Sequence, residues 1–226
     1  MLIVIEGLDG SGKSTQVRKV REYICERGLS LRYIHFPRYD APVVGEMISA
    51  FLRGDYGPND KVDPQIVALL YAEDRRDAAP QIREWLSQGD VVLLDRYVYS
   101  NIAFQCAKVA DPVARERLRS WIFESEYGKF LIPQPELNIF LDVPLSFVGS
   151  KLSAQRSGTD RDYLQGKDDI HEADMDFQRR VRDAYLDQCG KDSRFVRIDC
   201  SDEEGGMLPE DVIFEKIAAL INGYLG

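Results

Sequence analysis

The sequence predicts an α/β fold in which a five-stranded parallel sheet is flanked by helices. Apolar runs of strand length alternate with longer amphipathic stretches, which is the pattern of a parallel sheet covered by helices. The runs that qualify as strands are residues 2–6, 31–36, 91–95, 137–142 and 195–199. No low-complexity linker or internal repeat interrupts the alternation, so we expect a single domain over residues 1–226.

The composition limits the classes of function. The 226 residues are 44% hydrophobic and 30% charged, as in an ordinary globular protein. A net charge of −9 argues against a nucleic-acid partner, because duplex binding needs clustered Lys and Arg. No apolar run approaches the ~18 residues of a membrane span, and the short run after Met1 lacks the features of a signal peptide. The four cysteines have no paired spacing, so we expect reduced, buried thiols in a cytoplasmic protein.

The segments between the strands carry helix signals. Residues 13–26 place Val17, Val20 and Ile24 on one side, and Gly28 follows the last turn. Further helices are expected over residues 43–52, 64–78, 111–127, 144–155 and 210–224, with another beginning at Ser100. Residues 156–174 are densely charged and contain helix-breaking glycines, so they are expected to form a long loop that could fold over phosphates as a lid.

Residues 7–15 read GLDGSGKST and fill the pattern GxxxxGK[ST] between a predicted strand and a predicted helix. The glycines allow a tight turn whose N–H groups point at a phosphate, and the following helix adds its positive dipole end. The predicted contacts to a nucleoside triphosphate are Gly7, Gly10, Ser11, Gly12, Lys13, Ser14 and Thr15. Lys13 would reach the β and γ phosphates, and the Ser14 hydroxyl would coordinate Mg²⁺.

Several polar residues follow other predicted strands, where open α/β sheets bind their ligands. Asp95 ends the run VVLLD and matches the second acidic position of nucleoside triphosphatases, where a carboxylate contacts Mg²⁺ or its water shell. Arg38 follows the second strand after a proline. Tyr71 and Arg75 lie four residues apart on one helix face and could receive a base and a phosphate, or form ordinary packing and a surface ion pair.

In chain order, the phosphate loop, FPRY at 36–39, YAEDR at 71–75, DRY at 95–97 and PQP at 133–135 resemble the thymidylate kinase family. The resemblance covers essentially the whole chain. It implies a phosphate-loop kinase of three layers with a five-stranded parallel core and a lid. It also implies a homodimer that transfers a phosphoryl group from ATP to dTMP and produces ADP and dTDP.

The resemblance also implies roles for individual residues toward dTMP. Asp9 resembles the acid that holds the 3′ hydroxyl of dTMP or helps to place the Mg²⁺ shell. Arg38 and Arg96 match arginines near the acceptor phosphate, and Arg96 is counted among the catalytic residues. Phe104 lies where an aromatic ring excludes a ribose 2′ hydroxyl.

The base of dTMP has its own set of implied contacts. Tyr71 corresponds to the aromatic side chain that stacks on thymine, and Arg75 to the arginine that hydrogen-bonds the base. Asn101 lies where some members place a side chain beside the base.

The lid completes the set of implied site residues. Some family members carry an arginine inside the phosphate loop, where this chain has Gly10, so the catalytic cations are expected from Arg156 and Arg161 in the lid. Glu172 resembles the acid of a D-x-Y-E stretch and is a candidate for the metal shell. His171 replaces the aromatic residue of that stretch and is expected to be an ordinary exposed histidine.

Two alternatives stay open beside dTMP as acceptor. One is a phosphate-loop kinase for another nucleotide, deoxynucleotide or deoxynucleoside. The other is a nucleotide-dependent switch protein, which is disfavoured because the [NT]KxD motif of guanine-specific switches is absent.

Overall fold

The computed structural model describes residues 1–153, 159–167, 169–172 and 174–225. Within them, a parallel sheet of five strands has the order β2-β3-β1-β4-β5, which confirms the predicted fold class. The strands are β1 (Leu2–Gly7), β2 (Leu31–His35), β3 (Val91–Asp95), β4 (Leu137–Asp142) and β5 (Phe195–Asp199). All pairings are parallel, so the carboxyl ends of the strands meet at one edge of the sheet.

The central strand explains where the site forms. Every residue of β1 is buried, because β3 and β4 flank it and helices cover both faces. Its register pairs Ile5 with Asp95 of β3 and Gly7 with Leu141 of β4. The loop after β1 and the acid that ends β3 therefore lie side by side at the carboxyl edge.

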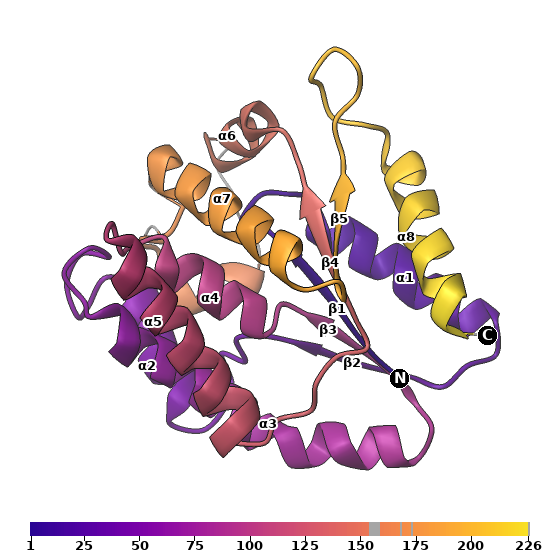
Figure 1. Ribbon diagram of the computed structural model, residues 1–226, viewed down its shortest axis with the longest axis horizontal. Helices are drawn as coiled ribbons and strands as arrows, with labels where there is room; N and C mark the ends of the chain where they lie inside the picture. The colour runs from indigo at the N-terminus through magenta and orange to yellow at the C-terminus, as the bar shows by residue number, and fades with distance from the viewer. Residues whose placement is uncertain (154–158, 168, 173, 226) are drawn as a thin grey trace.

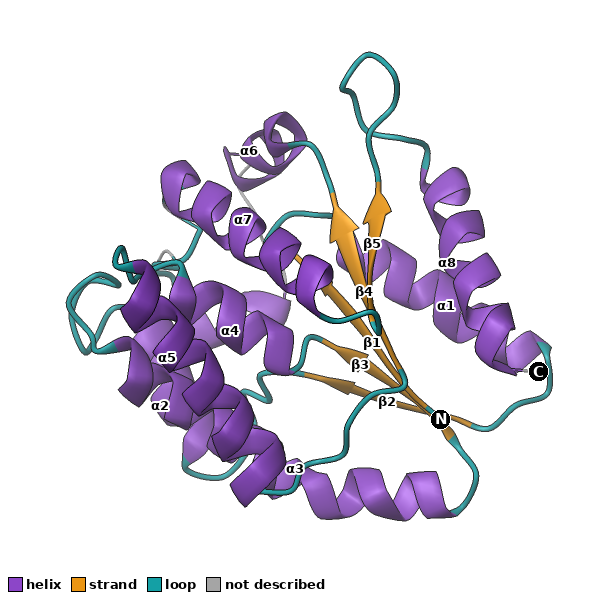
Figure 2. Cartoon of the chain, viewed as in Figure 1, coloured by secondary structure: helices purple, strands orange, loops and turns teal. Residues whose placement is uncertain are grey.

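The helices form two layers around the sheet (Figures 1 and 2). One face carries α1 (Lys13–Glu26) and α8 (Glu210–Leu225), which pack together. The other face carries α3 (Pro64–Ser87), α4 (Val98–Cys106) and α7 (Met175–Lys191). The remaining elements are α2 (Val44–Leu52), α5 (Pro112–Phe123), the π-helix η1 (Glu124–Lys129), α6 (Leu145–Ser153) and the 3-10 helix η2 (Thr159–Leu164).

Several boundaries differ from the predicted ones. The helix predicted over residues 64–78 continues to Ser87 with Pro80 inside it, because Ala78, Ala79 and Ile82 are buried and stabilise the turns around the proline. The segment predicted as one helix over residues 111–127 becomes α5 followed by η1. The sequence analysis assigned no element to α7, although α7 packs against β4 and β5.

One main core joins all five strands to both helix layers. A smaller cluster connects α2 with α3 and includes Ile48, Phe51 and Val67. All cysteines are free, but the expectation that all are buried is wrong, because Cys25 is exposed on α1. No helix among the described residues is both long and apolar enough to cross a membrane.

Candidate active site

The phosphate loop has the backbone that its sequence predicts. Gly10 and Gly12 adopt φ values of 73° and 76°, a region that disfavours residues with a Cβ. A Cβ on Gly7 would lie 2.8 Å from Oγ of Ser11, so a side chain at position 7 would push into the loop. Helix α1 begins directly after Gly12 without a side-chain cap, so its first N–H groups are available to an anion.

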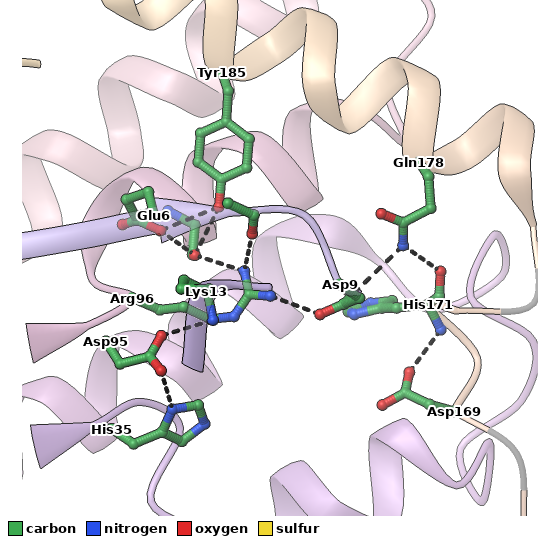
Figure 3. Close-up of polar contacts among 12 residues, drawn as sticks. Glu6, Asp9, Lys13, His35, Asp95, Arg96, Asp169, His171, Gln178 and Tyr185 are labelled. Atoms are coloured by element: carbon green, nitrogen blue, oxygen red, sulfur yellow. Dashed lines mark hydrogen bonds and ion pairs between the residues drawn. The ribbon is translucent and has the colours of Figure 1, made fainter. Parts of the chain in front are cut away.

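Lys13 and Asp95 form an ion pair at the carboxyl edge of the sheet (Figure 3). Nζ of Lys13 lies 2.7 Å from Oδ1 of Asp95, and Nδ1 of His35 lies 3.3 Å from Oδ2. Burial opposes ionisation of Asp95, but Lys13 and His35 overcome it and hold the pKa of Asp95 well below its usual range. The loop therefore carries a buried cation beside an ionised carboxylate.

The residues predicted for Mg²⁺ fit that ion by their chemistry. Asp95 is an ionised oxygen donor, and Ser14 is exposed at the start of α1, one residue after the lysine that pairs with Asp95. Among the described residues, no group of three or more His, Cys, Asp or Glu side chains could hold a metal by itself. This suits Mg²⁺, which is usually bound by one or two protein oxygens together with phosphates and waters.

Arg96 connects the end of β3 to the phosphate loop. Its Nη2 donates to Oδ1 of Asp9 at 2.6 Å, and its Nη1 donates to the carbonyl oxygen of Gly7 at 2.8 Å. Burial disfavours the charged form of Asp9, yet the charge of Arg96, with that of Lys13, lowers the pKa of Asp9. A fixed guanidinium and an ionised carboxylate thus lie next to each other beside the loop.

The buried side chain of Glu6 holds the residues around Arg96 in place. Its carboxylate is fully buried and accepts hydrogen bonds from the backbone N–H groups of Tyr97 and Ser100 and from the hydroxyl of Ser100. The hydroxyl of Tyr185 on α7 donates to the same carboxylate at 3.1 Å. Burial raises the pKa of Glu6, although these donors and Arg96 oppose that shift. One side chain of β1 therefore connects α4 and α7 next to Arg96 (Figure 3).

A cavity, here called the central cavity, opens beside Arg96 between the carboxyl edge and the helices α3 and α4. The structure brings most of the predicted dTMP contacts together in its wall. They are Asp9, Tyr71, Arg75, Arg96, Asn101 and Phe104. Residues far apart in the sequence thus surround one space that is continuous with the phosphate loop.

One wall of the central cavity contains a buried ion pair. Arg75 donates through Nε and Nη2 to both carboxylate oxygens of Glu126 on η1, and neither side chain is more than 3% exposed. The amide nitrogen of Asn101 donates to the same carboxylate at 2.9 Å and to the carbonyl oxygen of Ala68 at 3.0 Å. Arg75 therefore does not form the surface ion pair that the sequence analysis considered as an alternative.

The opposite wall contains His171, and the expectation that this histidine is exposed is wrong. It is only 6% exposed, with its ring 5.0 Å from Phe104 and 5.5 Å from Phe51 between ring centroids. Burial, the Lys108 ammonium and the Arg96 guanidinium lower the pKa of His171 to about 3, so the imidazole is neutral at physiological pH. Burial also raises the pKa of the adjacent Asp169 to about 7, with Asp9 adding repulsion.

The structure does not bring every predicted residue to the cavity wall. The guanidinium of Arg38 binds Asp74 on α3 at 2.8 Å and Asp77 at 2.7 Å, and Arg38 is not among the described lining residues. Glu172 does line the cavity. Arg156 lies outside the described residues, and only the backbone of Arg161 is described, within η2.

Residues that the sequence analysis missed support those that it found. Gln178 of α7 lies between the walls, because its amide nitrogen is 2.8 Å from the His171 carbonyl oxygen and 3.4 Å from Oδ2 of Asp9. Tyr39 and Tyr163 stack in the cavity wall with ring centroids 3.9 Å apart. Glu6, immediately before the phosphate loop, was recognisable as a charged residue within an apolar strand.

Comparison with known proteins identifies the family of this chain. The thymidylate kinase family model matches residues 5–207. The chain is 32% identical to the thymidylate kinase of Mycobacterium tuberculosis over 187 residues, which cover 83% of this chain and 85% of that protein. It is 34% identical to the thymidylate kinase of Homo sapiens over 145 residues, which cover 64% of this chain and 62% of the human protein.

A solved structure of thymidylate kinase from Candida albicans is similar along almost the whole chain. It superimposes with a TM-score of 0.70 at 27% identity and covers 99% of this chain and 91% of that one. The residues that the family model matches include the phosphate loop and the residues that line the central cavity. The chain therefore belongs to the thymidylate kinase family of ATP-dependent kinases.

Proposed function

We propose that this protein transfers the γ-phosphoryl group of ATP to dTMP and forms ADP and dTDP, a step toward dTTP. One observation carries the proposal: Asp9 of the phosphate loop, the half-buried Tyr71 and the buried Arg75 line the same cavity. A nucleotide whose base lies against Tyr71 and Arg75 then has its phosphate near the loop. Family membership supports dTMP as that nucleotide.

The donor side of the reaction uses the phosphate loop. Its backbone from Gly7 to Thr15 binds the ATP phosphates, and Lys13 neutralises charge on the β and γ phosphates. Ser14 and Asp95, with Glu172 of the lid, would hold Mg²⁺, which would supply positive charge to the phosphates. The lid over residues 156–174 supplies Arg156 and Arg161 as further cations.

The acceptor side needs orientation rather than a base. A nucleoside monophosphate already carries an ionised oxygen at neutral pH, so no side chain has to remove a proton. Arg96 holds that phosphate, with Arg38 nearby, while Asp9 binds the sugar and Phe104 packs against it. Tyr71 stacks on the base, and Arg75 and Asn101 bind its edge. The rate then depends on alignment and on charge neutralisation.

An acceptor panel tests the proposal most directly. ATP consumption is measured with dTMP, dUMP, dGMP, UMP and thymidine at one fixed ATP concentration. We expect a clear preference for dTMP, and a preference for any other acceptor would replace dTMP in the proposal. Consumption that does not depend on an acceptor would instead support a nucleotide-dependent switch.

The assembly proposed with this function is a homodimer of single-domain chains in the cytoplasm. The main core, which spans every strand, supports one domain, and the free cysteines suit a reducing compartment. An apolar surface on α2 and α3 supports the dimer, because Met47, Ile66 and Leu69 are 43%, 67% and 41% exposed. Light scattering on the wild type and on Ile66→Lys tests this, and we expect the variant to be monomeric.

A further inference from the structure

The proposed function leaves Glu126 without a role, although this acid is fully buried and binds two residues of the central cavity wall. Its side chain is 0% exposed and lies on η1, a π-helix that continues α5. Single π-helical turns are often found at functional sites. A buried ion pair that only stabilised the fold could be replaced as a pair by apolar side chains at little cost, so the partners of Glu126 indicate what it does.

Glu126 fixes the orientation of the Asn101 amide. The amide nitrogen of Asn101 faces the Ala68 carbonyl oxygen and Oε1 of Glu126, and both of these atoms only accept hydrogen bonds. The NH₂ group must therefore point toward them, and Oδ1 must point away. Oδ1 is buried and has no hydrogen-bond partner among the described residues. Asn101 thus offers a ligand an acceptor and no donor.

Glu126 fixes Arg75 in the same way. Nε and Nη2 of Arg75 both donate to the carboxylate, and Nη1 makes no hydrogen bond to the described residues. Oε1 of Glu126 accepts from Arg75 and from Asn101 at 2.8 and 2.9 Å, so these two side chains are neighbours. The cavity wall therefore presents a free donor beside a free acceptor.

We propose that Glu126 is a positioning residue that makes this site select bases with a carbonyl oxygen beside a ring N–H, such as thymine, over bases with an amino group beside a bare ring nitrogen, such as cytosine. A thymine edge satisfies both the Arg75 donor and the Asn101 acceptor. A cytosine edge places donor against donor and acceptor against acceptor. The inference rests on the proposed function for the location of the base.

The chemistry of Glu126→Gln makes the proposal testable. Glutamine has one oxygen and one NH₂ group in place of the two carboxylate oxygens. It therefore cannot accept hydrogen bonds at both positions, as Glu126 does from Arg75 and Asn101. If its NH₂ group faces Asn101, the Asn101 amide rotates and offers a donor to the base. Glu126→Asp keeps an acceptor-only carboxylate and should preserve the amide orientation even if it weakens binding.

The experiment measures binding of dTMP and dCMP by calorimetry without ATP, together with turnover of both nucleotides. We expect Glu126→Gln to lower the preference for dTMP at least about 10-fold, mainly through KM and Kd, because buried hydrogen-bond partners are left mismatched. Glu126→Asp should retain the preference within about 3-fold. Glu22→Gln is the matched control, because Glu22 is 57% exposed on α1, pairs with Arg18 and does not line the central cavity, and it should change nothing.

A double variant separates positioning from general damage. In an Asn101→Leu background the amide is gone, so Glu126→Gln should alter the preference far less than it does in the wild type. An equal loss for dTMP and dCMP in Glu126→Gln, or the same change in both backgrounds, would overturn the proposal. If Glu126→Gln does not fold, a full preference for dTMP in Asn101→Leu would also overturn it.

The two proposals fail in different ways. If the wild type binds dTMP selectively but transfers no phosphoryl group to it, the proposed activity is wrong and the Glu126 inference stands on the binding data. If the wild type phosphorylates dTMP and Glu126→Gln keeps its selectivity, the inference is wrong and the activity stands. Binding without any preference between dTMP and dCMP in the wild type would overturn the inference directly.

Discussion

Nη2 of Arg96 lies 2.6 Å from Oδ1 of Asp9, so the cation that follows β3 is bound to a carboxylate of the phosphate loop. The two side chains are only 12% and 22% exposed, which strengthens their interaction relative to a surface pair. Their position beside the central cavity places a fixed positive charge where an acceptor phosphate would meet the loop.

Replacing Arg96 by alanine should therefore reduce turnover strongly. We expect kcat/KM for dTMP to fall about 10²–10³-fold, because a preorganised cation near the transferred group is lost. Steady-state kinetics on the folded variant measure this. Arg18→Ala is a suitable control, since Arg18 is 58% exposed on α1 and its ion pair is with the exposed Glu22. Near-normal turnover of folded Arg96→Ala would contradict the role given to Arg96.

Asp169 should make stability depend on pH near neutrality. Its pKa is raised from 3.8 to about 7, so between these values the folded state keeps a proton that the unfolded state has lost. Stability from this group is full at low pH, falls as pH rises toward about 7, and is constant above. The free energy of unfolding of Asp169→Asn should therefore increase relative to that of the wild type as pH rises toward about 7. The increase is about 1.4 kcal/mol per pH unit and a few kcal/mol in all.

Thermal unfolding from pH 4 to about 8 checks this prediction for both proteins. The oxygen of asparagine can still accept from the His171 backbone N–H, which lies 2.8 Å from Oδ1 of Asp169, and its NH₂ group can donate to the Tyr163 hydroxyl, which lies 2.9 Å from Oδ2. The variant thus changes the charge with little change in shape. A difference in Tm that stays the same across the whole range would contradict the raised pKa.

Gly45 should tolerate no side chain. A Cβ there would lie 2.5 Å from the Tyr39 carbonyl oxygen and 2.8 Å from that of Arg38, and backbone atoms cannot move away easily. Gly45→Ala should destabilise the protein by about 1–3 kcal/mol and raise KM for dTMP, because the displaced turn lines the central cavity. Urea unfolding and kinetics measure both effects.

Gly190 of α7 provides the matched control for Gly45. A Cβ on Gly190 would meet nothing within 4 Å, and the residue is helical, so Gly190→Ala should leave stability unchanged or slightly increased. If both alanine variants have the same stability, the close approach of α2 to the backbone of Arg38 and Tyr39 does not exclude a side chain at position 45.

Variants of the buried ion pair between Arg75 and Glu126 should affect stability and dTMP binding differently. Glu126→Ala leaves the Arg75 guanidinium buried without its partner and should cost about 3–5 kcal/mol. The double variant Arg75→Met, Glu126→Leu replaces both charges by apolar groups and should recover most of that loss. It should still fail to bind dTMP in calorimetry. A double variant that binds dTMP normally would remove Arg75 from the site.

The sequence predicted those features that depend on a local pattern of residue types. The strands β1 and β3 begin with four consecutive apolar residues, LIVI and VVLL, because helices cover both faces of a parallel sheet. Asp95 and Arg96 come directly after such a run, so their place at the carboxyl edge followed from the sheet alone. The phosphate loop was recognisable because Gly10 and Gly12 need left-handed backbone conformations.

Side chains that act through distant partners could not be found in this way. Glu126 lies among surface-like charged residues, and its pairing with Arg75 joins positions 51 residues apart. His171 has the same limitation, because its burial depends on Phe51 and Phe104 from two other helices. Helix α7 begins after the charged segment of residues 156–174, and its many charged residues hide the stripe of Phe177, Val181 and Tyr185.

Helix α7 follows the lid segment directly and contacts both halves of the site. Gln178 near its start touches Asp9 and the backbone of His171, and Tyr185 two turns later binds Glu6 and Ser100 next to Arg96. Helix α7 therefore contacts the phosphate loop at Asp9 and, through Tyr185, the residues that hold Arg96 in place. A displacement of α7 would alter both contacts together, so the position of this helix is linked to the placement of Asp9 and to the residues around Arg96.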